Sequence, residues 1–326
     1  MGWRLVAAAT LLLVGAGITQ AQTDERLVVD PWPDKQWGQT FDHLLYQEQG
    51  HVRGEPGSQS NTQMFWWDSY GRFRFSSTDP NAFSLAYRYV TVNFDSRSPS
   101  LPDTLDKVSL AAGLHLGEFQ GGRVGLVLGA GWSGDNPFGD VDGMFGLAHL
   151  TWEKALNDRD ALVLSIDWDG GAAFLPDVPT PGFMYVHRED HGSFGVGYPR
   201  SFVRWDITDR LSAEAEYRVP YAIDAYLDYK IAGGFSVFGN VANWFEAFYL
   251  NDQPREDRFF QQMARAEVGV RYVNPNVFMG MSLDAALSVG YAFEQNFYRG
   301  FDVRDLDKTA EISDEPYVAL ILRGTF

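Results

Sequence analysis

The feature that most constrains the fold of this chain is a strict alternation of apolar and polar residues. In the segment 211–219 every second residue is apolar, and charged or hydroxyl side chains stand between them. The same alternation occupies the segments 123–132, 161–169, 223–231, 264–272 and 279–293. Only an extended strand places residues i and i+2 on the same side of the backbone. The body of the chain is therefore predicted to be β-sheet.

Two kinds of connection alternate between these segments. Tight junctions with turn residues occur at 119–122, 157–159, 208–210, 233–234 and 274–276. Longer acidic or proline-bearing stretches occur at 96–105, 134–142, 171–191, 250–258 and 295–313. A regular exchange of short turns and long loops indicates an up-and-down meander of antiparallel strands.

Strand length separates two all-β architectures. The alternating segments run from nine to about sixteen residues, whereas strands of soluble sandwiches have about 5–6 residues and a membrane crossing needs about 9–11. The apolar faces end in aromatic residues, as interfacial girdles do; these are Trp132, Trp168, Tyr217, Tyr272, Tyr291 and Phe293. We therefore expect an all-β fold, a single antiparallel transmembrane β-barrel. An exported soluble β-protein remains the alternative.

Composition agrees with a strand that faces lipid on one side and water on the other. Hydrophobic residues make up 45% of the chain and aromatic residues 15%, yet mean hydropathy is −0.23. No stretch in the body approaches 18 uninterrupted apolar residues, so we expect no transmembrane helix. A net charge of −17 disfavours nucleic acid as a partner. The absence of cysteine excludes disulfides, thiolate metal sites and cysteine nucleophiles.

The first 21 residues have the three-part pattern of a secretory signal peptide. Arg4 precedes an apolar run of about fourteen residues, Leu5 to Ile18, and small and polar residues follow up to Ala21. The run is shorter than the roughly 20 residues that span a bilayer, which disfavours an N-terminal membrane helix. We expect cleavage after Ala21 and export, without a lipoprotein anchor.

The chain ends in Tyr317-Val-Ala-Leu-Ile-Leu-Arg-Gly-Thr-Phe326, with apolar residues at every second position back from Phe326 except Gly324. This ending resembles the closing strand of bacterial outer-membrane β-barrels of the Gram-negative type. The resemblance implies location in the cell outer membrane, contact with its lipid and lipopolysaccharide, and recognition of the terminal strand by the barrel-assembly machinery. Such barrels usually have an aromatic residue third from the end, where this chain has Gly324. The stretches 197–205, 217–221 and 229–230 are similar to uncharacterised bacterial barrel proteins, a similarity that implies no activity.

Domain organisation follows from where the alternation begins. We expect a signal peptide at 1–21, a periplasmic extension or partial plug at 22–61, and the barrel at 62–326. About thirteen segments are recognisable from residue 64 onward, whereas single-chain bacterial barrels have an even number. A strand near 40–53, or a miscount around Pro220, would restore an even count; a short helix at 37–48 is the other possibility for this region. We predict 12 strands, with 14 as the alternative.

The polar strand faces are predicted to line the lumen. Their charged residues are Arg72, Arg74, Glu214, Glu216, Arg218, Asp224, Asp228, Arg265, Glu267 and Arg271. Two carboxylate pairs, Glu214 with Glu216 and Asp167 with Asp169, lie about 7 Å apart on one strand face. Such pairs could serve acid–base chemistry or a barrel protease with acidic pairs and a histidine. An internal salt-bridge network explains them better, because charges inside a barrel must be paired or solvated.

His191 and Ser193 form the most suggestive catalytic pair, because residues i and i+2 on a strand share a face. The pair resembles the His-x-Ser of outer-membrane phospholipases and lipid A deacylases, although the Asp or Asn that would support it is missing. Two acidic groups could hold calcium, but neither has EF-hand spacing; they are Asp135, Asp140 and Asp142, and Asp302, Asp305 and Asp307. No phosphate, dinucleotide or zinc-hydrolase motif is present, so neither a cofactor nor a metal is expected.

These observations support three functions to different degrees. The first is an outer-membrane barrel that forms a narrow or plugged porin-like channel for small solutes, or that serves structurally. Twelve strands fall between the filled barrels of eight strands and the open porins of 16–18, which argues against a wide pore. The second is a barrel-embedded lipid hydrolase that uses His191 and Ser193. The third is the exported soluble β-protein. Because no motif identifies a reaction, the sequence favours a non-catalytic role.

Overall fold

The structure is a computed structural model that describes residues 37–53, 62–79, 81–219, 222–278 and 281–326. The expected signal peptide at 1–21, most of the N-terminal extension, and the Gly/Ser stretch at 54–61 lie outside the described residues. Within the described ranges, no helix is long and apolar enough to cross a membrane.

The described residues form eighteen strands and one short 3-10 turn, η1 (Val141–Gly143). The strands are β1 (Gly38–Gln47), β2 (Val52–Arg53), β3 (Gln63–Arg74), β4 (Ser84–Asp95), β5 (Thr104–Phe119), β6 (Gly122–Gly134), β7 (Met144–Ala155), β8 (Asp160–Asp169), β9 (Thr180–Glu189), β10 (Gly192–Tyr198), β11 (Arg200–Asp206), β12 (Leu211–Arg218), β13 (Ala222–Ala232), β14 (Phe235–Phe248), β15 (Arg258–Phe278), β16 (Met281–Gly300), β17 (Asp307–Ile312) and β18 (Glu315–Thr325).

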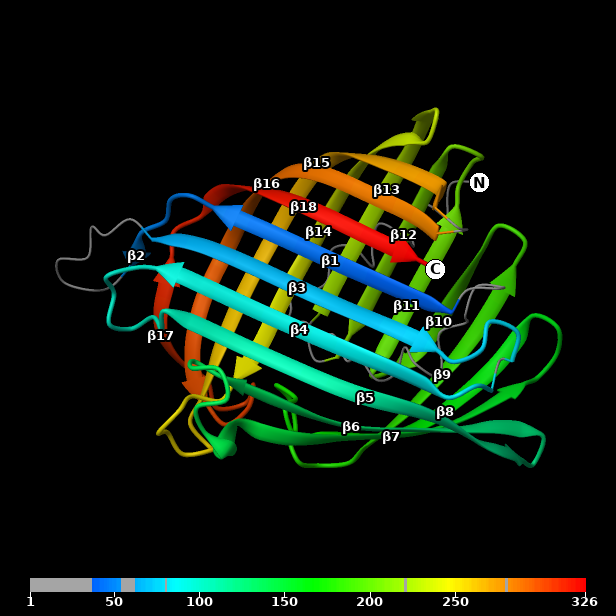
Figure 1. Ribbon diagram of the computed structural model, residues 1–326, viewed down its shortest axis with the longest axis horizontal. Coiled ribbons are helices and arrows are strands. Elements are labelled where there is room, and N and C mark those ends of the chain that lie inside the picture. Colours follow the sequence, from blue (N-terminus) through cyan, green and yellow to red (C-terminus); the bar gives the residue numbers. More distant parts are fainter. Residues whose placement is uncertain (1–36, 54–61, 80, 220–221, 279–280) are drawn as a thin grey trace.

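Sixteen of the strands that the structure describes pair in an antiparallel ring (Figure 1). The ring runs from β1 through β3 to β16 and then to β18, which pairs with β1 from Val318 to Thr325, for example Leu44 opposite Leu320. β2 and β17 pair with each other outside the ring. The closed all-β barrel with a C-terminal closing strand, as predicted from the sequence, is confirmed.

The predicted strand number, 12 or 14, was wrong. One strand, β1, lies within the segment assigned to the N-terminal extension, and it replaces the short helix considered for 37–48. A second, β9, lies within the predicted loop 171–191. β10 and β11 are separated only by Pro199, so they read as one segment in the sequence. Four of the five predicted tight turns are present, but 274–276 lies within β15.

The two ends of the barrel differ. The terminal end, at the right in Figure 1, carries the start of β1, the end of β18 and short turns such as 120–121 and 233–234. The loop end carries β2, β17 and the longer connections 96–103, 135–143, 170–179, 249–257 and 301–306. Most long connections lie at the loop end, as in transmembrane barrels, although the nine-residue connection 75–83 lies at the terminal end and Pro199 alone joins β10 to β11 at the loop end.

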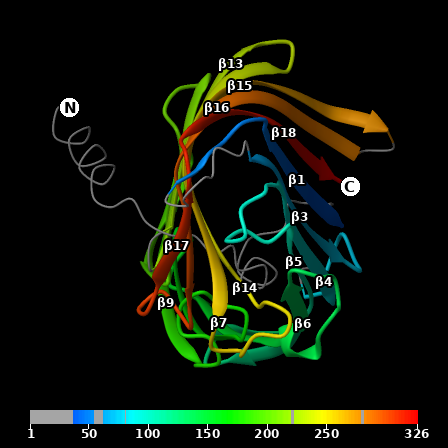
Figure 2. The same cartoon turned by 90° about the vertical axis from the view of Figure 1, so that its left-hand side faces the viewer.

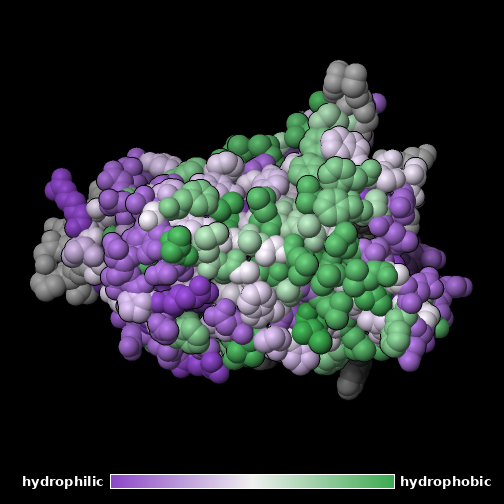
Figure 3. Space-filling model, turned by 60° about the horizontal axis from the view of Figure 1, so that its bottom comes forward, coloured by the Kyte–Doolittle hydropathy of each residue, from purple (hydrophilic) through white to green (hydrophobic). Residues whose placement is uncertain are grey.

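The outer surface of the barrel carries an apolar belt. Large aliphatic side chains point outward and are exposed, with Leu110 64%, Val268 63% and Leu287 65% accessible. Figure 3 shows apolar residues over the middle of the barrel and hydrophilic residues toward both ends. On β6 the outward residues from Val124 to Trp132 cover eight steps, or about 20 Å of height at a tilt of roughly 40°. A belt of this height suits the hydrocarbon core of an outer membrane.

Aromatic residues border this belt on both sides, as girdles at two membrane–water interfaces do. On the side of the loop end they are Trp67, Tyr89, Trp132, Trp168, Tyr198, Tyr217 and Tyr291. On the side of the terminal end they are Trp37, Phe73, Phe119, Trp152, Tyr185, Trp205, Tyr229, Tyr272 and Phe326.

The interior changes character along the barrel axis. In the half next to the loop end, side chains from opposite walls form a hydrophobic core that includes Leu45, Trp66, Val92, Phe248 and Phe297. Trp66 on β3 and Trp244 on β14 meet edge to face, with ring centroids 5.4 Å apart. Seen from the loop end, β14 lies toward the middle of the ring rather than at its outline (Figure 2). The half next to the terminal end carries charged side chains such as Asp228 and Arg271, together with small apolar clusters such as that of Phe238, Ala286 and Ile321.

Candidate functional site

All ten residues predicted to line the lumen lie on the strand faces that alternate with the apolar outer faces. Glu216, Arg218, Asp228 and Arg271 take part in ion pairs. Arg271 contacts Asp228 at 3.3 Å and Asp284 at 2.6 Å, and Arg323 joins the same Asp284 at 3.2 Å. Glu267 accepts hydrogen bonds from Ser288 and Tyr317.

The two carboxylate pairs have different surroundings. Glu214 is exposed in the lumen, whereas Glu216 lies between Arg200, 2.8 Å away, and Arg218. Asp167 contacts His149 across from it on β7 and accepts a hydrogen bond from Ser165 at 3.0 Å. Asp169 accepts a hydrogen bond from the backbone N–H of Gly171 at 2.7 Å. The pairs therefore act as separate partners of basic and polar groups rather than as joint carboxylate sites.

A buried ion cluster crosses the lumen beside the hydrophobic core, with Glu246 between the core residues Trp244 and Phe248 on β14. Glu246 on β14 is fully buried and lies 2.9 Å from Arg88 on β4 and 2.7 Å from Lys107 on β5. Arg88 also binds both carboxylate oxygens of Asp68 at 3.2 Å. Two cations thus meet two anions, which balances the charge in a site with little water. The pairing joins walls that lie on nearly opposite sides of the ring.

Glu246 was not among the residues predicted from the sequence. The residue stands in the aromatic run Asn243-Trp-Phe-Glu-Ala-Phe-Tyr249, where both strand faces are apolar and no alternation marks the lumen side. A single carboxylate in an apolar run could have identified this residue, because a charge that is buried among apolar side chains requires a partner of opposite charge.

The connection 170–179 is fixed against this cluster by its backbone carbonyls. Lys107 donates to the carbonyl of Gly171 at 2.9 Å, and Arg258 donates to that of Ala172 at 2.7 Å. Tyr249 donates to the carbonyl of Gly170 at 2.5 Å. The backbone N–H of Val303, in the connection 301–306, donates to the carbonyl of Ala173 at 3.2 Å. Two loops are thereby joined over the loop end of the barrel.

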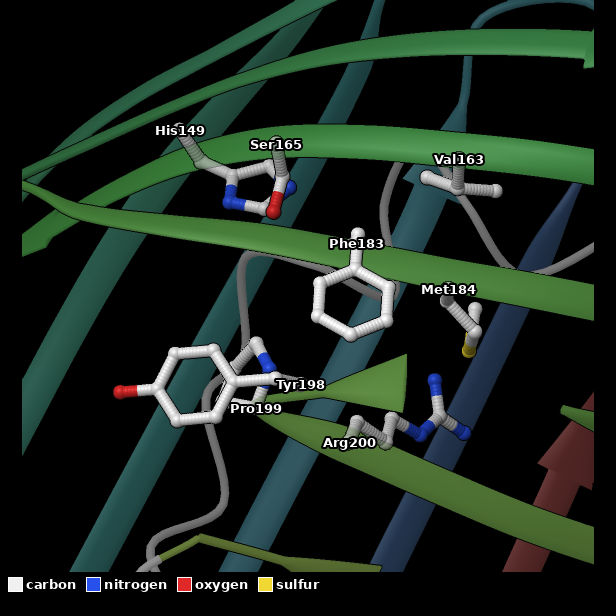
Figure 4. Close-up of a pocket in the computed structure, with 8 residues that line it drawn as sticks. All are labelled: His149, Val163, Ser165, Phe183, Met184, Tyr198, Pro199 and Arg200. Atoms are coloured by element: carbon white, nitrogen blue, oxygen red, sulfur yellow. The ribbon is translucent and has the colours of Figure 1, made fainter. Parts of the chain in front are cut away.

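A cavity lies beside the β10–β11 hairpin, at the loop-end edge of the wall. It has a volume of about 20 Å³, room for about one water molecule, and is lined by His149, Val163, Ser165, Phe183, Met184, Tyr198, Pro199 and Arg200. In Figure 4 the Ser165 hydroxyl lies beside the His149 ring, and Arg200 lies on the opposite side, below Met184. No sequence pattern pointed to this cavity, because its residues come from five strands and a turn.

The suggestive pair of the sequence analysis, His191 and Ser193, lies elsewhere. His191 is in the turn between β9 and β10, and Ser193 pairs with Arg188 and Arg204 on the neighbouring strands. This turn belongs to the terminal end, whereas the sequence suggested the end of a long loop near the outer leaflet. The lipid-hydrolase hypothesis therefore gains no support from their position.

The acidic loop residues are used locally. Asp135 accepts a hydrogen bond from the backbone of Asn251 at 3.0 Å, and Asp140 caps η1 by accepting one from Asp142. Asp302 pairs with Arg304, and Asp305 accepts hydrogen bonds from the backbone of Phe301 and Asp302. Among the residues that the structure describes, no group of three or more histidine and acidic side chains is arranged to hold a metal ion.

Comparison with known proteins extends only to the general shape. No protein-family model matches the sequence, and no curated protein is significantly similar to it. A TodX deltaS2S3 mutant, described as a monoaromatic hydrocarbon channel, gives a TM-score of 0.41 at 9% identity, over 96% of this chain and 98% of that one. A FadL homologue from Pseudomonas aeruginosa gives 0.41 at 10%, over 96% and 99%.

The outer membrane protease OmpT from Escherichia coli gives a TM-score of 0.22 at 10% identity, over 91% of this chain and 99% of that one. At such scores and identities the likeness carries no argument about function. What this chain has by its own geometry is a closed antiparallel barrel with an apolar belt outside and charges within, the architecture predicted from the sequence.

Proposed function

We propose that the protein is an outer-membrane β-barrel that forms a narrow passage for small solutes, closed at its loop end in this structure. The observation that carries the proposal is the change of character along the lumen. Ion pairs of lumen-facing charges on the terminal side, such as Arg271 with Asp228, give way toward the loop end to the Glu246 cluster and the hydrophobic core, which join opposite walls.

The proposed location follows from the exterior. In a soluble protein, every large aliphatic side chain that is exposed to water has an unfavourable hydration free energy. A closed belt of such side chains between two aromatic girdles is therefore not expected on a soluble protein. In a membrane the apolar side chains of this belt contact lipid tails instead of water. The closed ring of strands also leaves no strand edge with unpaired backbone groups in the lipid. The loop end would face outward and the terminal end the periplasm, as in bacterial barrels with short periplasmic turns.

Sixteen strands are enough to enclose a water-filled channel, since porins of 16–18 strands do so. In this barrel residues of opposite walls instead meet in the loop half of the lumen, notably Trp66 and Trp244. The passage would therefore be restricted, and conduction would require these contacts or the connection 170–179 to move.

The first test is membrane fractionation of cells that express the protein. Retention in the outer-membrane fraction after washes with high salt and alkaline carbonate is expected, together with heat-modifiable gel migration. Release by carbonate would contradict the proposal that the barrel is embedded in the outer membrane, and it would favour the exported soluble β-protein.

The second test is conductance in planar bilayers. We expect small or infrequent steps for the wild type and larger ones for Trp244→Ala, because that change removes a ring from the seal. Trp152→Ala is the matched control, since Trp152 belongs to the outer face at the terminal end and its loss leaves the lumen unchanged. No steps in either wild type or Trp244→Ala, at any voltage or salt, would leave a structural role.

A further inference from the structure

Arg265 on β15 is a buried cation without a carboxylate partner. The residue faces the lumen and is 7% exposed. None of the ion pairs between residues that the structure describes includes it. Its Nε and one terminal guanidinium nitrogen are buried and have no hydrogen-bond partner. Because a guanidinium is always charged and a buried charge without a partner is strongly unfavourable, this position requires an anion.

Two carboxylates on the same part of the wall are held by other groups. Glu267, two residues further along the same face of β15, accepts hydrogen bonds from Ser288 at 2.9 Å and from Tyr317 at 3.1 Å. Asp224 on β13, two strands away, accepts a hydrogen bond from Asn240 at 2.6 Å. Neither carboxylate forms an ion pair with the guanidinium, so its charge has no contact partner on its own wall.

Further buried nitrogens without partners surround the ring of Trp66 on β3, four strands away from β15 around the barrel. The Arg265 guanidinium carbon lies 5.2 Å from the centroid of this ring. The ring of His43 lies 4.9 Å from it and the ring of Trp244 lies 5.4 Å from it, centroid to centroid. The indole nitrogens of Trp66 and Trp244 and Nε2 of His43 are buried and have no hydrogen-bond partner. Since an indole nitrogen can only donate, this group offers one positive charge and several N–H donors to a ligand.

We infer that Arg265, with the indole N–H groups of Trp66 and Trp244, binds a small monovalent anion in the lumen, of which chloride is the simplest. Hydrogen bonds from a charged donor are roughly twice as strong as neutral ones. The site lies at the edge of the hydrophobic core, next to Met263 on the side of the terminal end. Met263 is 1% and Trp66 is 2% exposed, and such close packing favours an anion of one atom over phosphate or an organic ion.

Binding is tested by urea-induced unfolding of the detergent-solubilised, full-length protein in potassium chloride and in potassium gluconate at equal ionic strength. Gluconate has the same charge as chloride but is too large for the site. An anion that binds only the folded protein lowers the unfolding constant by the factor 1 + [L]/Kd, which is about tenfold at a concentration of about ten times Kd. We expect a saturating decrease of this kind in chloride and none in gluconate. Equal unfolding constants in the two salts at every concentration would overturn the inference.

Two arginines on the lumen face of β15 provide matched variants. Arg271 lies six residues beyond Arg265 and is paired with Asp228 and Asp284. Arg265→Gln should abolish the effect of chloride, and it should still fold in gluconate because the change removes an unpaired buried charge. Arg271→Gln should lose stability in both salts and keep the effect of chloride. An effect of chloride that persists in Arg265→Gln, or that disappears equally in both variants, contradicts the assignment.

Two neighbouring tryptophans test the part of the indole N–H. Trp66 belongs to the lumen face of β3, whereas the N–H of Trp67 donates to Asp42 on the outer face at 3.1 Å. Trp66→Phe keeps an aromatic ring but removes one donor, and it should weaken chloride binding about fivefold. Trp67→Phe should bind chloride like the wild type. Unchanged affinity in Trp66→Phe, or equal weakening in both variants, contradicts the assignment of the indole.

As a determinant of selectivity the anion site rests on the proposed passage, but the binding step does not. A basic residue in a pore favours anions, so reversal potentials in a gradient of potassium chloride should show a preference for chloride that Arg265→Gln reduces. Conductance without an effect of chloride on unfolding would refute the anion site alone. An effect of chloride on unfolding without conductance would refute the passage alone.

Discussion

The carboxylate of Glu246 on β14 lies 2.9 Å from the guanidinium of Arg88 on β4. These two strands are far apart in the ring, because five other strands lie between them on the shorter side. An ion pair across a sixteen-stranded ring requires the ring to be flattened, and Cα atoms of β14 and β5 indeed come within 8 Å of one another. The cluster therefore determines the cross-section of the barrel as well as its closure.

Glu246→Ala is expected to destabilise the barrel strongly. The change removes the carboxylate that contacts both Arg88 and Lys107, and breaking a buried ion pair by removing one partner costs about 3–5 kcal/mol. Urea-induced unfolding in detergent, followed by tryptophan fluorescence, measures the change. Glu214→Ala is the control, because Glu214 is an exposed lumen carboxylate. A free energy of unfolding as high for Glu246→Ala as for Glu214→Ala would mean that the cluster does not hold the walls together.

Leu287→Arg is expected to impair folding into lipid. Leu287 is 65% exposed on the outer belt, where an arginine near the bilayer midplane costs about 2–4 kcal/mol. Glu214→Arg places the same side chain in the lumen, where water can solvate it. The comparison is made by refolding both variants into phospholipid vesicles and scoring heat-modifiable migration. In a soluble protein an exposed leucine tolerates arginine, so equal refolding yields would count against the membrane-facing belt.

Alternation along the strands indicated which residues share a face, because apolar and polar side chains take opposite sides of an extended strand. It failed where that contrast disappears. On β1 the outer face carries Asp42 and the lumen face Phe41 and Leu45. The binary pattern is therefore reversed in part, and the sequence suggested a strand near 40–53 only as one alternative. The residues of β14 from Asn243 onward are buried on both faces, and a doubly buried strand has no polar side to detect.

The candidate site was beyond sequence reasoning for a different reason. The cavity is formed by strands β7 to β11, and its Arg200 follows a one-residue turn that no spacing rule identified. The Glu246 cluster combines residues 139 and 158 positions apart. Which lumen charges meet across a barrel depends on strand number and flattening, and the sequence predicted too few strands.

Acidification is expected to loosen the loop end before the barrel unfolds. The hydrogen bond from Arg299 lowers the pKa of Asp257 below its ordinary 3.8, and the hydrogen bond from Lys308, with the charge of Arg53, lowers that of Glu311 below 4.5. A carboxyl group whose pKa is lowered by folding stabilises the fold above its unfolded pKa and loses that effect as pH falls through its folded pKa. Both contributions are thus present at neutral pH and decline below about pH 4.

Asp257→Asn isolates one of these contributions. Because the Asp257 side chain is 41% exposed, the pair is worth only about 0.3–0.5 kcal/mol after screening. The free energy of unfolding should therefore fall by that amount at pH 7, and variant and wild type should converge near pH 3. A difference that persists unchanged at pH 3 would show that ionisation of Asp257 is not its source.

The last residue, Phe326, closes the ring and also carries the resemblance to outer-membrane barrels. Its backbone N–H donates to the carbonyl of Gly38 at 3.0 Å, its carbonyl accepts from Trp37 at 2.8 Å, and its ring lies 5.6 Å from the ring of Trp37. If the terminal side chain serves recognition by the assembly machinery, Phe326→Ala should reduce insertion in cells far more than it lowers the stability of refolded protein.

Trp37→Ala removes the same ring contact from the other side and leaves the C-terminal residue intact. The two variants should therefore have similar free energies of unfolding in detergent, since each loses one aromatic pair worth about 0.5–1.5 kcal/mol. Only Phe326→Ala should accumulate unassembled protein in the periplasm, measured by fractionation and gel migration without heating. Equal assembly defects in both variants would show that loss of the contact between the two aromatic rings causes the defect. Closure of β1 on β18 would then depend on the aromatic pair and not on recognition of the terminal residue.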